Sequence, residues 1–403
     1  MIGSNRITGI QTQSTPPSVG SFRGILTGSN RMTGIQTQST PPSVGSFRGI
    51  LIGCTVFICG EIFGFVIEKG RVFEPSVVCD QMLMKRFVML KMFLSAVISG
   101  MFCMSVMSML PFTRQKFLNA RQTLVNDLQG KGYLTVMLDG FILGIGMALG
   151  GTCPGVVFAQ LGTGSQNAVY TLLGTLAGAL LYGVLEPTLM SLTKPNKPVK
   201  YQFLFHVLGS PYHTTAIPVA AILSVIVFTL EIAYPWDTEV KDSESTSMWK
   251  ASSWPPFFTG FIVGSLEVPL ILIVGGLLGA SSSYCTVTAQ VLVTDKMKQK
   301  VPYLVKFKSG LSNWWQVVFV VAAIHGASSS SQLSGTYGTI EGQSVLMSFC
   351  GGVLIIVGAR LAEGCTSGHG ISGMGLLNSL SIATMMSMFI GGMLSARCIQ
   401  MMT

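Results

Sequence analysis

The sequence predicts an all-α polytopic membrane protein with about nine transmembrane spans, broken or re-entrant half-helices and two pseudo-symmetric halves. Three observations support this prediction. Of the 403 residues, 49% are hydrophobic and only 10% are charged, and the mean hydropathy is +0.58, outside the usual range of soluble domains. Apolar runs long enough to cross a bilayer recur along the chain. Glycine-rich polar stretches interrupt several of these runs.

The N-terminal segment is a near-perfect duplication. Residues 3–26 recur at 28–51, with Met32 in place of Ile7. The segment is rich in Ser, Thr, Gln, Pro and Gly, so it has too little apolar surface to offset the entropy of ordering, and we expect disorder over 1–47. A targeting signal and a gene-model artefact are both open interpretations. We expect an integral membrane protein of the plasma membrane, with an organelle membrane as the alternative.

The predicted spans follow from the length of about 20 mostly apolar residues that a membrane helix needs. They lie near 49–67, 88–110, 134–149, 166–190, 216–234, 257–280, 312–326, 344–362 and 375–395. An acidic linker at 237–254 separates a first half at 48–236 from a second half at 255–403. The third, sixth and eighth spans run into polar breaks, and such breaks at matching places in two halves indicate a transport site.

The basic residues orient only part of the chain. The net charge of +9 does not indicate a nucleic-acid partner, because these residues lie in short loops between apolar runs. The 294–308 loop carries five lysines and one aspartate and is predicted to be cytoplasmic. The 326–343 loop has no Lys or Arg and is predicted to lie on the opposite side. Loops 68–87 and 111–133 are both basic, so the first half is not oriented.

An internal repeat relates the breaks. Laying 146–153 on 358–365 aligns two glycines, two leucines and two cysteines at an offset of 212 residues. A weaker match at an offset of 211 sets 64–74 against 275–285. The matches predict four broken elements, which carry Glu74, Cys153, Cys285 and Cys365.

The motifs at the breaks resemble a known family. GARLAEGCTSGHGISGMG at 358–375, LGASSSYCTVTAQVL at 278–292 and GGTCPG at 150–155 resemble the YeeE/YedE sulphur-transport family. The resemblance covers about residues 50–398, and the two halves look like paired short members of that family fused into one chain.

The resemblance implies a transporter or channel for thiosulfate or a related small sulphur-containing ion. It places Cys153, Cys285 and Cys365 along the path as thiols. Longer bacterial members have a further cysteine in the first element, where this chain has Glu74, which is either a structural acceptor for Arg71 or a gate. As partners we expect the sulphur oxyanion, the lipid bilayer and, as a further candidate, a soluble sulphur-accepting protein.

The residue types at the breaks suit such an ion. An anion at the bilayer centre needs N–H groups, hydroxyls and the positive ends of half-helices to offset its desolvation. Glycines let the backbone approach closely, and protonated thiols are weak, polarizable donors suited to a soft sulphur atom. The candidate pathway residues are Glu74, Gly151, Thr152, Cys153, Gly155, Cys285, Gly364, Cys365, Thr366, Ser367, Gly368, His369 and Gly370.

Other interpretations of the same residues stay open. A membrane thiol oxidoreductase or sulphur transferase that uses a cysteine persulfide is the alternative function, although no CxxC, nucleotide or flavin motif supports an enzyme. Cys365 and His369 lack a third nearby ligand, so we expect neither a metal nor another cofactor. Arg360 and Glu363 are predicted to pair. The remaining six cysteines are predicted to be small buried hydrophobic residues.

Overall fold

The computed structural model describes residues 47–193, 195, 199, 202–240, 247–310, 313–361 and 363–402. The predicted disordered segment therefore lies outside the described residues, except for Phe47, which begins a helix. In the described part of the chain the regular structure is helical, and the one isolated β-bridge joins Phe203 to Asn378. Eight described helices are long and apolar enough to span a membrane, and a ninth span results when one bent pair is counted as one. The predicted all-α, multi-pass class is confirmed.

The spanning helices follow the predicted apolar runs. They are α1 (Phe47–Lys69), α3 (Val88–Met109), α5 (Tyr133–Gly150), α7 (Ala168–Thr193), α9 (Tyr212–Ala233), a run of α11, α12 and η1 (Pro256–Val274), α15 (Trp315–Ser334), the bent pair α16 (Val345–Leu361) and η3 (Thr366–Gly373), and α17 (Ser379–Met402). Within the run, α11 is Pro256–Ser265, α12 is Glu267–Pro269 and η1 is Leu270–Val274. η1 and η3 are π-helical.

Shorter helices fill the connections. They are α2 (Pro75–Met82), α4 (Pro111–Asp127), α6 (Val156–Gly162), α8 (Leu204–Val207), α10 (Trp236–Glu239), α13 (Ser281–Leu292) and α14 (Pro302–Val305). A proline occupies the first turn of α2, α4 and α14, where the missing N–H has no helical partner to lose.

The seventh span is longer than the sequence predicts. The predicted span ends at residue 326, whereas α15 continues through a serine run to Ser334. The hydroxyls of Ser330 and Ser334 donate to the buried Glu68 carboxylate of α1, at 2.5 and 3.1 Å. The serine run is therefore helical because α1 supplies an acceptor for its hydroxyls, which the sequence pattern does not reveal.

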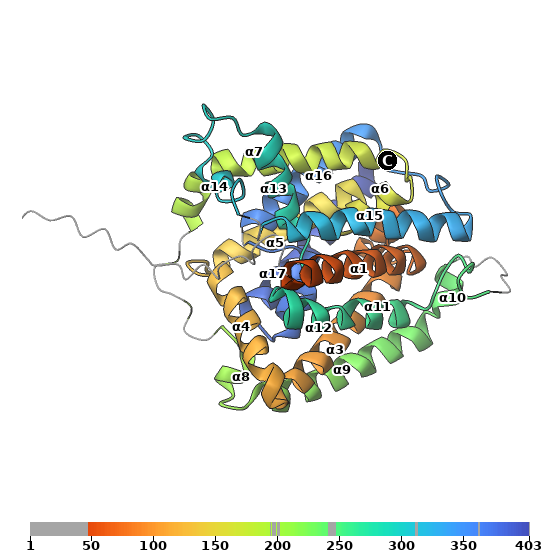
Figure 1. Cartoon of the computed structure of the whole chain (residues 1–403). Helices are drawn as coiled ribbons and strands as arrows, with labels where there is room; N and C mark the ends of the chain where they lie inside the picture. Colours follow the sequence, from red (N-terminus) through yellow and green to blue (C-terminus); the bar gives the residue numbers. More distant parts are fainter. Residues whose placement is uncertain are drawn as a thin grey trace, which may run out of the picture. The chain divides into compact units, whose positions relative to one another are not determined.

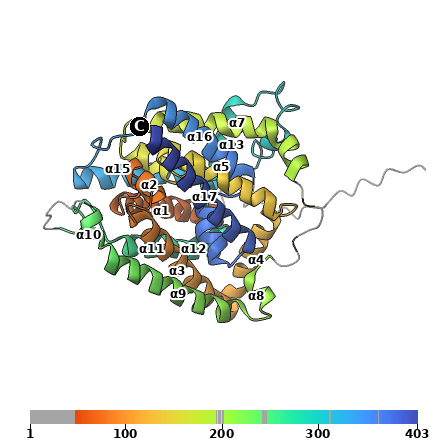
Figure 2. The ribbon, with the colours of Figure 1, turned by 180° about the vertical axis from the view of Figure 1, so that it is seen from behind.

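The two halves repeat the same packing. In order, α1, α2, α3, α5, α6 and α7 correspond to the α11–η1 run, α13, α15, α16, η3 and α17. α1 packs on α15 as α11 packs on α3, and α7 packs on α16 as α17 packs on α5 (Figures 1 and 2). α9 packs on α3 and lies outside this correspondence. The contacts thus agree with the repeat found in the sequence.

The central pair α5 and α16 shows that the second half is inverted. A Cβ on Gly351, near the start of α16, would lie 2.6 Å from the Gly150 Cα at the end of α5. A Cβ on Gly358, near the end of α16, would lie 2.9 Å from the Leu143 Cα. The helices therefore run antiparallel, with glycines that let their backbones touch. Equivalent helices that run antiparallel make an inverted repeat.

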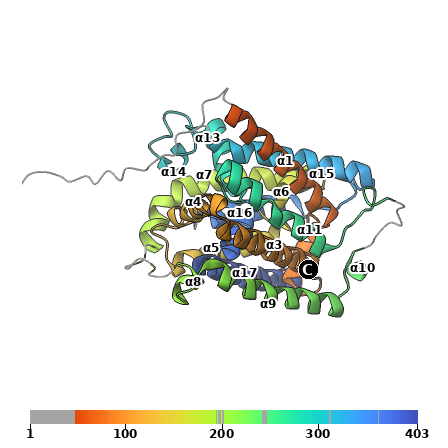
Figure 3. The same cartoon turned by 60° about the horizontal axis from the view of Figure 1, so that its bottom comes forward.

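Two of the basic segments, α4 and the Lys-rich loop before α15, lie at one end of the helix bundle. α1 and α15 lie side by side (Figure 3), and Gly60 and Gly64 of α1 face Phe319 and Ala323 of α15, so the two helices run parallel. The start of α1 therefore lies at the same end as the Lys-rich loop that precedes α15. α4 lies there too, because it lines one cavity with the start of α1. The positive-inside rule predicts a cytoplasmic position for this end, whereas the basic 68–87 loop lies at the other end of α1.

Candidate functional site

The three predicted thiols are buried in broken elements of both halves. Cys153 lies in the turn between α5 and α6, and Cys365 lies directly before η3. Cys285 lies in the second turn of α13. Their exposed fractions are 7%, 1% and 0%, respectively. The interior of the protein therefore surrounds all three.

The break in the first half is held by neutral groups. α5 ends at Gly151, whose φ of 59° is left-handed and favours glycine. The side-chain amide of Gln160 donates to the carbonyls of Gly151 at 3.0 Å and Phe73 at 2.8 Å. A Cβ on Gly151 would lie 2.6 Å from the Pro75 Cβ, so the start of α2 packs directly on the break. One amide thus joins the first two broken elements.

The break in the second half is held by a buried ion pair. Arg360, near the end of α16, is 2% exposed, and its Nη2 lies 2.5 Å from the Glu363 carboxylate. Its Nη1 donates to the hydroxyl of Ser282 at 2.9 Å, and the Tyr303 hydroxyl donates to Glu363 at 2.8 Å. The predicted pairing of Arg360 with Glu363 is confirmed. Through it, α16 is tied to α13 and α14.

Cys153 and Cys365 come from opposite halves and belong to one cluster. The Cys153 thiol interacts with the Thr366 side chain and with Cys365. The Cys365 Sγ lies 3.1 Å from the Ser367 Oγ and also interacts with the Ser281 side chain of α13. The inverted fold therefore brings three of the four predicted elements together.

Backbone N–H groups lie close to both of these cysteines. The N–H groups of Val156 and Val157, at the start of α6, donate to the Cys153 carbonyl at 3.0 and 3.1 Å, and the Gly155 N–H lies near the Cys153 thiol. The N–H groups of Gly368 in η3 and Ala280, just before α13, lie near the Cys365 thiol. The cluster therefore presents a set of hydrogen-bond donors to any anion beside the thiols.

Tyr284 and Cys285 connect α13 to the rest of the site. The Tyr284 hydroxyl donates to the Pro154 carbonyl at 2.7 Å, and its ring stacks on Phe158 with centroids 4.8 Å apart. Cys285 interacts electrostatically with Arg360 and Glu363. The sequence analysis did not single out Tyr284, although its place beside Cys285 in the predicted motif was a usable signal.

His369 packs inside the second break. Its Nδ1 lies 3.0 Å from the Ser381 Oγ, and its backbone N–H donates to the Cys365 carbonyl at 2.7 Å. A Cβ on Gly364 would lie 2.4 Å from the imidazole ring, so glycine is needed there. Among the described residues, no group of three or more His, Cys, Asp or Glu side chains is placed to hold a metal ion.

Glu74 occupies the predicted cysteine slot at the start of α2. Its Oε1 lies 2.5 Å from the Arg71 Nε, and both side chains are largely buried, with 15% and 12% exposed. This ion pair is the contact expected of a structural acceptor, so it favours that alternative over a gate.

Two further polar groups hold the second-half elements, and the sequence analysis missed their roles. Glu267 is fully buried, accepts a hydrogen bond from the Ser372 hydroxyl of η3 and accepts another from the Leu278 N–H at 3.4 Å. Lys131 is 7% exposed and donates to the Leu361 carbonyl at 2.7 Å, and burial lowers the pKa of its ammonium. The acidic residue within an apolar stretch was the available signal for Glu267, whereas Lys131 lies in a basic loop that gave no such signal.

The six remaining cysteines do not all follow the prediction of burial. Cys59 is buried, and Cys79 and Cys103 are half-buried. Cys54, Cys350 and Cys398 are exposed on spanning helices, so the prediction is wrong for these three. A thiol is apolar enough to face lipid as well as core, so composition alone does not separate the two environments.

Comparison with known proteins agrees with this architecture. A family model described as Sulphur transport matches residues 69–394. The chain is 24% identical over 338 residues to the thiosulfate transporter TsuA of Escherichia coli (strain K12), which covers 78% of this chain and 85% of the relative. Two proteins of Xylella fastidiosa (strains 9a5c and Temecula1), each named a probable transporter, are 28% and 29% identical over 143 residues.

The Xylella relatives match over 92% of their own length but only 36% of this chain. The family match begins at Lys69, the last residue of α1, and spans both halves, including the residues that carry Glu74, Cys153, Cys285 and Cys365. The chain is a membrane-spanning member of the Sulphur transport family.

Proposed function

We propose that this protein moves thiosulfate, or a related small sulphur-containing ion, across the membrane along a central path lined by the thiols of Cys153, Cys285 and Cys365. The observation that carries the proposal is the cluster in which the Cys153 thiol of the first half lies beside Thr366 and near Cys365 of the second half, whose thiol in turn lies near Ser281 of α13. The name of the Escherichia coli relative supports thiosulfate as the ion.

The cluster has the donors that such an ion needs. Moving an oxyanion out of water is costly unless hydrogen bonds replace its hydration. The N–H groups of Gly155 and Gly368 and the hydroxyls of Thr366 and Ser367 supply replacements next to the thiols. Protonated thiols add weak donors, so the ion is held without being trapped.

The cationic group near the path is already neutralised. Arg360 interacts with Cys285, yet its guanidinium is paired with Glu363. An unpaired buried cation would bind a divalent anion tightly and slow its release, whereas a paired one adds a smaller positive potential. We therefore assign Arg360 to holding the path open and Cys285 to contacting the ion.

The other candidate residues line the same breaks in this proposal. Glycines keep the backbone accessible, Thr152 adds a hydroxyl and His369 orders the second break. These residues are Gly151, Thr152, Gly155, Gly364, Gly368, His369 and Gly370. Glu74 is assigned a structural role through Arg71.

Flux of labelled thiosulfate into proteoliposomes tests the proposal, with and without a proton gradient. We expect the wild type to transport, and Cys365→Ala to lower the rate roughly tenfold or more, because a hydrogen bond to a charged group contributes about 1.5–3 kcal/mol. Cys350→Ala is the matched control, since Cys350 is an exposed cysteine on α16 outside the cluster.

Undiminished flux through the Cys365→Ala variant would rule out a transport path that depends on the Cys365 thiol. Absence of wild-type flux, together with labelled sulphur left on the protein as a persulfide, would instead support the sulphur-transferase alternative.

A further inference from the structure

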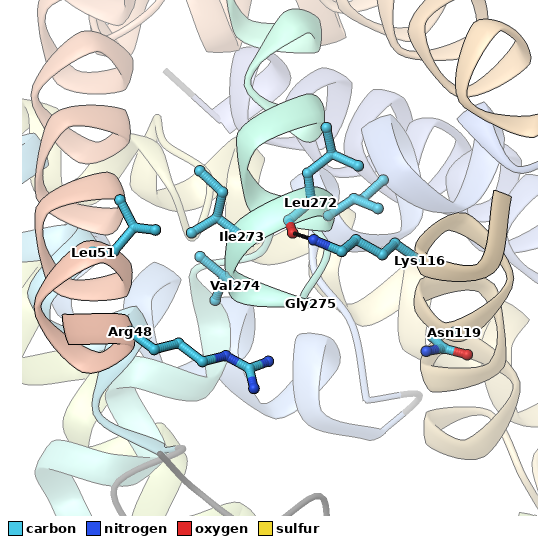
Figure 4. A pocket seen from close by; sticks show the side chains of 9 residues that line it. Arg48, Leu51, Lys116, Asn119, Leu272, Ile273, Val274 and Gly275 are labelled. Carbon is cyan, nitrogen blue, oxygen red and sulfur yellow. Dashed lines mark hydrogen bonds between the residues drawn. The ribbon is translucent and has the colours of Figure 1, made fainter. Parts of the chain in front are cut away.

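A cavity of about 370 Å³ lies at the basic end of the protein, away from the thiol cluster. Its walls come from the start of α1, from α4 and from residues 271–275, which include the end of η1 (Figure 4). Of the nine residues that line it, two are basic, Arg48 and Lys116, and none is acidic. The cavity therefore carries positive charge without a fixed counter-charge in its wall.

The two basic side chains face one another across the cavity. Figure 4 shows Arg48 of α1 and Lys116 of α4 reaching from opposite walls toward the turn at Gly275. The Lys116 Nζ donates to the Leu272 carbonyl at 2.5 Å, which fixes this ammonium at the cavity wall. Both residues are exposed to solvent at their helices, so an ion in water can reach them.

The segment that lines the cavity leads along the chain to residues of the thiol site. Gly275 ends η1 in a left-handed turn, with a φ of 78°. The next residues, 276–280, lead directly to Ser281, which interacts with Cys365, and to Cys285 in the following turn. Leu278 in this connection accepts a hydrogen bond from Ser372 of η3 at 3.1 Å. The segment that forms the cavity wall thus continues into the path.

We propose that this cavity is a cytoplasmic vestibule where the transported sulphur oxyanion binds as it enters or leaves the path, with Arg48 and Lys116 as its ligands. The proposal rests on the proposed function. A doubly charged oxyanion gains from two convergent cations, and a concave site lined by one sign of charge raises the local concentration of the opposite sign. The effect acts only on ions presented from this side.

Thiosulfate flux in oriented proteoliposomes of neutral phosphatidylcholine tests the vestibule. We compare wild type with the double variant Arg48→Gln/Lys116→Gln and with Arg48→Lys/Lys116→Arg, which keeps both charges. Loss of both charges is expected to raise the half-saturating concentration from the cytoplasmic side by roughly three- to tenfold and to flatten its dependence on salt. The maximal rate with thiosulfate presented from the cytoplasmic side stays near wild type.

Arg114→Gln is the matched control, because Arg114 is an exposed basic residue of α4 outside the cavity lining. An unchanged half-saturating concentration in the double variant, or an equal rise in Arg114→Gln, would overturn the vestibule while leaving the transport function intact. An effect seen only when anionic lipid is added would overturn it too, since a lipid phosphate would then be the occupant. Absence of wild-type flux would overturn the proposed function and the vestibule together.

Discussion

The two central breaks of the repeat place a cysteine at the same point but are stabilised in different ways. The α5–α6 break is held by Gln160, whose neutral amide satisfies the carbonyls of Gly151 and Phe73. The α16–η3 break is held by the Arg360–Glu363 pair and the hydroxyls of α13 and Tyr303. Neutral hydrogen bonds therefore stabilise the break in the first half, and a largely buried ion pair stabilises the break in the second half.

This difference shows what the repeat preserves. Cys153 and Cys365 occupy equivalent positions, although different groups stabilise the two breaks. The position of the thiol is therefore the feature that the two breaks share. The supports differ because their neighbours differ, since α2 packs on the first break and α13 on the second. The charged support also places Cys285 near an ion pair, for which the first break has no counterpart.

The largest expected effect comes from breaking the charged support. Arg360→Met leaves the Glu363 carboxylate without its cation, and removing one partner of a buried pair costs about 3–5 kcal/mol. We expect a lower unfolding temperature in detergent and loss of flux. Arg86→Met, which removes a more exposed pair with Asp80, is the control and should change little. Equal stability of the two variants would show that the ion pair does not hold the break.

The next effect tests whether the halves are equivalent in packing. A Cβ on Gly144 of α5 would lie 2.0 Å from the Met388 carbonyl, and one on Gly174 of α7 would lie 2.1 Å from the Phe349 carbonyl. Gly144→Ala and Gly174→Ala should each destabilise the protein by about 3 kcal/mol, because backbone must move apart.

Thermal unfolding of the two glycine variants provides the measurement. The control is Gly53→Ala in α1, where a Cβ meets nothing within 4 Å. Strongly unequal losses in Gly144→Ala and Gly174→Ala would argue against equivalent α5–α17 and α7–α16 interfaces.

A smaller effect is expected from breaking the neutral support. Gln160→Leu leaves two carbonyls without their donor, at a cost of about 1–2 kcal/mol. Flux should fall because Cys153 is less well placed, while folding survives. Gln122→Leu, which removes an exposed amide bonded to Asn126, is the comparison. Flux at the wild-type level in Gln160→Leu would show that the Gln160 amide is not needed to position Cys153.

The smallest effect is expected at the first element. Glu74→Gln removes the charge of a largely buried ion pair but keeps an oxygen acceptor for Arg71, so stability should change by about 1 kcal/mol and flux by less than about twofold. Competition between thiosulfate and sulfate in the same flux assay measures selectivity. An altered preference would show that Glu74 is a gate.

Several features of the site follow from local sequence. The equivalence of Cys153 and Cys365 is visible as an alignment of the two halves, and the three-residue spacing of Arg360 and Glu363 brings them to one side of a helix end. The spans are predictable because the bilayer demands about 20 apolar residues in a row. Ser330 and Ser334 show the limit, since their helical state depends on Glu68 far away in the chain.

The sequence by itself determined the membrane class, the positions of the breaks and the cysteines that they carry, because these depend on composition and short-range spacing. Only the tertiary structure decided that the halves are inverted, that Cys153 meets Thr366 and Cys365, and that Arg48 and Lys116 share one cavity. Those relations depend on which glycine surfaces of distant helices fit together. The pattern of apolar residues along one helix does not show which other helix packs against it, so the helix pairing is known only from the tertiary structure.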